Sequence, residues 1–159
     1  MTISELQDDL MEELRALFSG FLTKSPQIGD DSKAILSKLN IFGQTLPIGE
    51  EEPYPYILVR IDSGAMRGDS ANLVKVRLFI GTFDDSINTN GHKDVINIIQ
   101  KIYERFAKNP VLASKYAMKN DNENPFTWVL QEKDSYPYYF GTVEFTWETM
   151  AIRKESQYT

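Results

Sequence analysis

The sequence predicts one α+β domain, a two-layer sandwich in which a mainly antiparallel four-stranded sheet carries helices packed on one face. The tripeptide Tyr-Pro-Tyr occurs twice, at 54–56 and 136–138, and each copy directly precedes an apolar run of strand character. Proline cannot donate to a sheet ladder, so it favours the first residue of a strand or an edge strand. Helical periodicity precedes the first run and separates it from the second, so helices and strands alternate along one layered domain.

The composition is that of an ordinary soluble protein. A chain of 159 residues that is 42% hydrophobic and 25% charged fits a single domain over 1–159 with a real core. Without cysteine, disulfides and thiolate metal sites are excluded. A net charge of −6 argues against the phosphate backbone as main partner, so we expect no sequence-specific nucleic acid binding. No signal peptide or long apolar span is visible, and we expect an intracellular protein with no membrane partner.

The first helix is predicted over about 2–21. Thr2 and Glu5 have the spacing of a capping box, in which each side chain satisfies an orphan backbone amide. Apolar residues then recur in steps of three and four until Ser25-Pro26 breaks the pattern. A short second helix is predicted within 32–39, followed by an irregular segment over 40–49.

The core sheet and the main helix are predicted over about 54–150. Strand 56–62 is apolar on both faces and should be central, whereas strand 73–83 alternates and should bury one face. Between them, 63–72 is polar and predicts a hairpin loop. The helix over 92–108 carries a wide apolar stripe, and Asn109-Pro110 ends it.

The remaining segments complete the predicted sheet. A helical turn is expected near 112–118, and strands over 126–132 and 138–150. Trp128 and Phe145 are expected in the core. The polar tail 153–159 is expected to fray.

Candidate chemistry is sparse, and we expect no catalytic residue, cofactor or metal. His92 is the single histidine, and one histidine without cysteine or an ordered carboxylate set makes a poor metal site. Its most economical interpretation is an exposed residue in the first turn of a helix. Neither a nucleophile elbow nor a phosphate-binding glycine loop is present.

The tyrosines that flank the two prolines are the one feature whose chemistry favours a partner. Tyrosine at the start of a strand is typical of surfaces where an apolar ring meets another protein and its hydroxyl forms a hydrogen bond. Rings that pack beside the prolines to fix the start of each strand explain the pattern equally well. Both interpretations stay open.

Several segments in order carry a resemblance to a known family. They are 53–59, 74–84, 90–95, 126–130 and 136–141. Together they resemble small tail-assembly proteins encoded in prophages of Gram-positive bacteria. The chain is also similar in architecture to the tail-terminator, or tail-completion, proteins of long-tailed bacteriophages, over roughly 40–150.

The resemblance implies a structural protein of the virion tail, assembled in the host cytoplasm, without enzyme activity or cofactor. Its implied partners are further copies of itself in a ring, usually a hexamer, the tail-tube protein that the ring caps, and a neck or connector protein. The family has no motif that maps onto single binding residues here, so interface candidates follow from position alone. These candidates are Tyr54, Tyr56, Met66, Arg67, Lys75, Arg77, Tyr136 and Tyr138.

Two alternatives remain beside the tail terminator. A neck protein, which joins head and tail in the same module, would share the same features. A small hydrolase or ligand-binding domain with a cleft near His92 is the alternative from another class.

Overall fold

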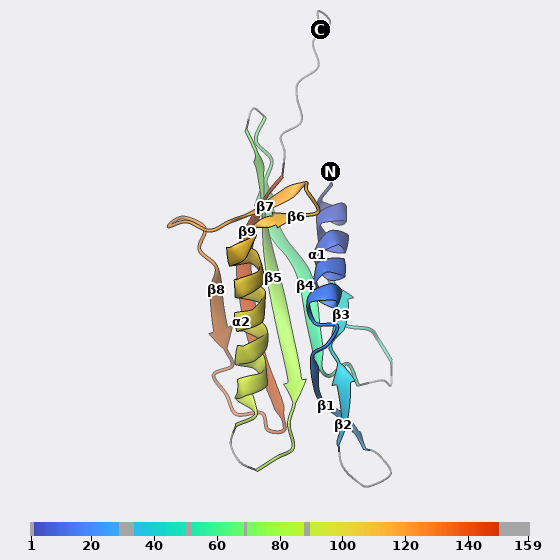
Figure 1. Ribbon diagram of the computed structural model, residues 1–159. Coiled ribbons are helices and arrows are strands. Elements are labelled where there is room, and N and C mark those ends of the chain that lie inside the picture. Colours follow the sequence, from blue (N-terminus) through green and yellow to red (C-terminus); the bar gives the residue numbers. More distant parts are fainter. Residues whose placement is uncertain (1, 29–33, 50–51, 69, 88–89, 150–159) are drawn as a thin grey trace, which may run out of the picture.

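The computed structural model describes residues 2–28, 34–49, 52–68, 70–87 and 90–149. In these ranges the chain forms two helices, α1 (Ile3–Leu17) and α2 (His92–Lys108), and nine strands (Figure 1). The strands are β1 (Leu22–Ile28), β2 (Ala34–Lys38), β3 (Asn40–Gly43), β4 (Tyr56–Ala65), β5 (Asn72–Phe83), β6 (Val111–Leu112), β7 (Tyr116–Lys119), β8 (Thr127–Leu130) and β9 (Tyr138–Thr149). The predicted frayed tail, 153–159, lies outside the described residues.

The predicted fold class is wrong, because the described sheet is larger and mixed. Seven strands form one curled sheet in the order β3-β4-β5-β9-β7-β6, and β8 pairs with β9 beside β7. β3 runs parallel to β4, and the other pairs are antiparallel. A separate two-stranded sheet joins β1 to β2.

The additional strands occupy segments whose own pattern is weak. The predicted second helix over 32–39 is largely strand β2, which pairs with β1 across Ser25-Pro26. The ladder register shifts between Lys24 and Ile28, so Pro26 sits where no regular hydrogen bond is required of it. Likewise β3 replaces the irregular 40–49, and β6 and β7 replace the helical turn near 112–118. Each of these short strands pairs with a segment that either lies far away in the sequence or has no clear strand pattern of its own.

The first helix begins as predicted and ends earlier. Thr2 is the N-cap, and its hydroxyl oxygen accepts a hydrogen bond from the Glu5 amide at 3.0 Å. The helix ends at Leu17, four residues before the predicted end, because Phe18 leaves the helical conformation and packs edge-on against Phe21 at 5.5 Å.

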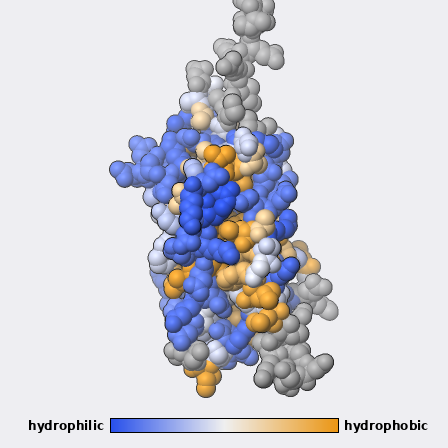
Figure 2. Space-filling view, in the orientation of Figure 1, coloured by the Kyte–Doolittle hydropathy of each residue, from blue (hydrophilic) through white to orange (hydrophobic). Residues whose placement is uncertain are grey.

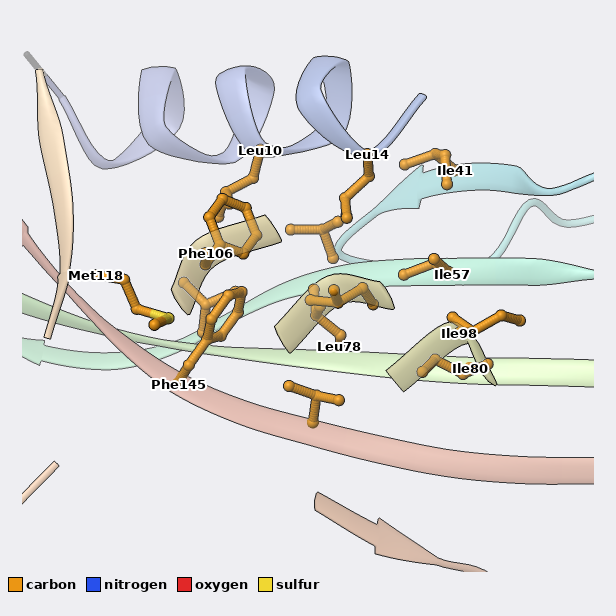
Figure 3. Close-up of a cluster of buried hydrophobic side chains, with 14 of the residues drawn as sticks. Leu10, Leu14, Ile41, Ile57, Leu78, Ile80, Ile98, Phe106, Met118 and Phe145 are labelled. Atoms are coloured by element: carbon orange, nitrogen blue, oxygen red, sulfur yellow. The ribbon is translucent and has the colours of Figure 1, made fainter. Parts of the chain in front are cut away.

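One continuous core lies between the helices and one face of the sheet. Val59, Leu78 and Val143 form a row across the three central strands, and each is fully buried. Both helices cover this face (Figure 1), and side chains from helices and sheet interlock there (Figure 3). Burying one such aliphatic side chain contributes about 1.5–3 kcal/mol. The core includes Leu10, Leu14, Ile57, Ile80, Ile98, Ile102, Phe106, Phe145 and Trp147.

The prediction that Trp128 lies in the core is wrong. Phe145 is buried at 1% exposure, whereas Trp128 is 54% exposed. Alternation along 126–132 predicts which side chains share a face, but it does not tell whether anything covers that face. β8 pairs with β9 alone, so its other edge has no neighbour among the described strands.

Candidate interaction surfaces

The tyrosines of the two Tyr-Pro-Tyr segments meet at one end of the sheet. The Tyr54 ring lies 5.3 Å from that of Tyr56 and 4.6 Å from that of Tyr138. Each segment contains a cis proline; the Pro55 carbonyl accepts a hydrogen bond from the Asn40 amide, and the Pro137 carbonyl accepts one from the Asp84 amide, both at 2.9 Å. The sequence alone does not predict this contact, because some eighty residues separate the two segments.

This tyrosine cluster is packed rather than open. Tyr56 is 6% exposed, and burial raises the pKa of its hydroxyl to about 12, with a further contribution from Tyr54. A Cβ at Gly81 would lie 2.3 Å from the Tyr56 ring, so glycine is the residue that lets the ring lie flat on the sheet. Tyr136 stands at the rim, 49% exposed, and its hydroxyl donates to the Asp85 carbonyl at 2.5 Å.

The two predicted basic candidates lie on the sheet face opposite the helices. Arg77 contacts Glu144 at 3.1 Å and Asp62 at 3.6 Å, and Lys75 contacts Glu144 at 3.3 Å. The acidic partners of both side chains are therefore supplied by the same chain. Half-exposed pairs of this kind contribute little stability, roughly 0–1 kcal/mol each.

The last two candidates lie at the far end of the β4–β5 hairpin. Met66 is 77% exposed, and the Arg67 amide donates to Asn72 at 2.8 Å. A groove of about 750 Å³ runs between this hairpin and the start of α1, lined largely by apolar groups including those of Ile3 and Leu73. Gly64 allows the hairpin strands to approach, because a Cβ there would lie 2.6 Å from the Leu73 carbonyl.

The strand predicted over 126–132 is present as β8, but sequence reasoning missed that it forms an exposed edge. Trp128 and Val129 are 54% and 62% exposed on this strand, one edge of which has no partner among the described strands. The Gln131 amide donates to the Phe140 carbonyl at 3.1 Å, and in an antiparallel ladder inward-facing and outward-facing residues alternate. The backbone groups of Trp128 and Leu130 therefore point away from β9. The sequence signal for this strand is an alternating pattern followed by the charged turn Glu132-Lys133-Asp134. This signal does not tell whether the strand lies at the edge or in the centre of the sheet.

The opposite edge of the sheet, at β3, is covered by side chains. Arg15 of α1 donates to the Ile41 carbonyl at 3.3 Å. Just beyond β3, the side-chain oxygen of Gln44 accepts a hydrogen bond from the Ile61 backbone amide at 3.1 Å. The side-chain nitrogen of Gln44 donates a hydrogen bond to the Ile61 carbonyl at 3.2 Å. Side chains therefore occupy backbone groups that an added strand would need, and β8 is the more open edge.

A third apolar surface lies on the β1–β2 pair. Leu22 and Leu36 are 54% and 59% exposed, and hydrophobic side chains gather where α1 meets this pair (Figure 2). Lys24 of β1 anchors the pair through Asp84 at 3.1 Å and Asp85 at 3.5 Å. The hydrogen bond to Asp84 raises the pKa of Lys24 against the opposing effect of burial. Burial disfavours the charged form of Asp84, but hydrogen bonds from Ser86 and Lys24 outweigh it and lower the pKa of that carboxyl.

His92 lies beside a small cavity at the start of α2. His92 is the exposed first residue of α2 and lines a cavity of about 190 Å³ together with Glu132, Asp134 and Tyr139. Among the described residues, no group of three or more histidines and carboxylates is arranged to hold a metal ion. In the same ranges, neither helix has the length and apolar character needed to cross a bilayer.

Comparison with known proteins identifies the fold and nothing finer. No family model matches the chain, and no curated protein matches it. One solved structure superposes with a TM-score of 0.54 over 95% of this chain and 94% of its own, at 7% sequence identity. At that identity the likeness shows a shared fold alone.

Proposed function

We propose that this protein is a structural protein of a bacteriophage tail, a tail terminator that caps the tail tube as a closed ring and joins the tail to the head. The observation that carries the proposal is the open β8 edge with its exposed Trp128 and Val129. The resemblance of 40–150 to tail-completion proteins supplies the biological setting.

An exposed apolar edge strand is a liability for a protein that works alone. Unpaired amides and carbonyls template pairing with another chain, so soluble proteins protect edges with charge, proline or covering side chains. This chain protects β3 in that way, through Arg15 and Gln44, and leaves β8 open. The contrast between the two edges favours β8 as the edge that pairs with another protein chain.

The distribution of exposed apolar side chains suits a ring. The strands β8 and β2 lie on different sides of the molecule (Figure 1), and each carries an exposed apolar residue, Val129 on β8 and Leu36 on β2. A contact that joins two different surfaces is heterologous, and heterologous contacts close into rings when the rotation between subunits allows it. An isologous dimer would use one surface and leave the other exposed.

The experiment is tail-tube growth in the presence of purified protein, with a matched pair of variants. Val129→Lys places a charge on β8, and Val111→Lys places the same charge at a 44% exposed position of β6. We expect wild type and Val111→Lys to stop tube growth as discrete rings and Val129→Lys to fail. Wild-type protein that leaves tube growth unchanged would overturn the proposal, and wild-type protein that binds heads but not tubes would assign it to the neck.

A further inference from the structure

We propose that neighbouring subunits join by strand addition, with β2 of one copy pairing antiparallel to β8 of the next. This inference rests on the proposed function, because the ring supplies the second copy.

The β8 edge is geometrically ready to accept a strand. The outward backbone groups of Trp128 and Leu130 have no strand beyond them in the described part of the chain, while the neighbouring Thr127 and Val129 pair with Glu144 and Thr142 on β9. Main-chain hydrogen bonds supply affinity in strand addition, and the side chains on either side supply specificity. Trp128 and Val129 offer an exposed apolar side chain on each face of the strand.

The β1–β2 pair is a sheet that lacks a third strand. Two strands alone are marginally stable in water, and three with an apolar face are the usual minimum. β1 is the inner strand, since Lys24 binds Asp84 and Asp85 beside the main sheet, and β2 is the outer one (Figure 1). On β2, Leu36 is 59% exposed. A strand added to β2 would complete the sheet and cover this side chain.

Strand direction and charge agree with the pairing. β2 and β8 run in opposite directions along the molecule (Figure 1), so rotation about an axis along the strands brings them together antiparallel. Lys38, at the end of β2, then comes beside the start of β8, which Glu123 precedes. Both side chains belong to exposed residues, and neither forms an ion pair within the described ranges.

The test uses cysteine crosslinking in a chain that has no cysteine of its own. The double variant Leu36→Cys/Val129→Cys is treated with a short bismaleimide, beside each single variant and the control pair Leu36→Cys/Val111→Cys. We expect a ladder of covalent oligomers that ends at the ring size for the double variant, and little product for the others. Dimers from Val129→Cys alone, or rings that give no ladder, would overturn the pairing.

A charge exchange provides an independent readout and separates the two proposals. Lys38→Glu should weaken assembly about fivefold, as expected for loss of one partly exposed pair, and the added Glu123→Lys should restore it. Rings that ignore both changes would overturn the pairing while leaving the ring itself intact. A wild-type protein that forms no ring, with or without tail tubes, would remove the proposed function together with this inference.

Discussion

Truncation of the Trp128 side chain should weaken assembly of the subunits and leave the stability of the single subunit nearly unchanged. The side chain is 54% exposed in the isolated subunit, so Trp128→Ala removes few internal contacts. A tryptophan side chain presents up to about 250 Å², of which roughly half remains for a partner to cover. At about 25 cal/mol per Å², the loss on assembly is roughly 3 kcal/mol per contact, or about 100-fold in the subunit dissociation constant.

The assay is sedimentation velocity over a concentration series, paired with urea unfolding of the monomer. We expect the midpoint of assembly to rise about 100-fold, while the free energy of unfolding falls by less than about 1 kcal/mol. The control is Phe145→Ala, which deletes a buried ring and should cost about 3–5 kcal/mol of stability. If Trp128→Ala unfolds the subunit as Phe145→Ala does, or leaves assembly unchanged, the reasoning about β8 is wrong.

Four further outcomes follow from the structure. Gly81→Ala should lower the midpoint of urea unfolding, because its Cβ would lie 2.3 Å from the Tyr56 ring; an unchanged midpoint would contradict the packing. Burial raises the pKa of Tyr56 to about 12, so folding stability should fall by on the order of 2 kcal/mol as pH rises from about 10 to 12, and Tyr56→Phe should flatten that slope in alkaline melts. The lowered pKa of Asp84 stabilises the fold above its unfolded value near 4, so stability should fall on acidification below about pH 4 and Asp84→Asn should lessen the fall; equal acid slopes would refute this. His92→Ala should assemble and cap tubes normally, whereas the hydrolase alternative requires it to be inactive.

The parts of the fold that sequence could predict are those with strong periodicity. Val76 and Leu78 alternate with charged residues, and the structure buries that face under the helices. The apolar stripe of 92–108 became α2 over the predicted range, and Thr2 caps α1. In each case the local pattern alone determines which side is buried.

The parts that failed depend on which segments pair across the chain. Leu36 fits a helix or a strand equally well, and its pairing with Lys24 on β1 decides the outcome. Trp128 has a core-like pattern, yet β8 lies at an edge where no other described strand pairs with it. Those facts are properties of the assembled sheet.

For the candidate surfaces too, the sequence identified residues by local pattern but did not predict what those residues contact in the folded chain. The tyrosines at 54, 56 and 138 were identified from sequence, and the structure brings them together in a cluster that is largely packed. Lys75 and Arg77 were proposed as interface candidates, but Glu144 of the same chain already pairs with both. The edge that carries the proposed contact has no local signature, because exposure of β8 follows from sheet order alone.

The most direct test of the account is the mass of the wild-type particle, measured by light scattering alone and with purified tail tubes. The account predicts a discrete ring of fixed copy number, formed either freely or at the tube end. A protein that stays monomeric at every concentration and ignores tail tubes would contradict it.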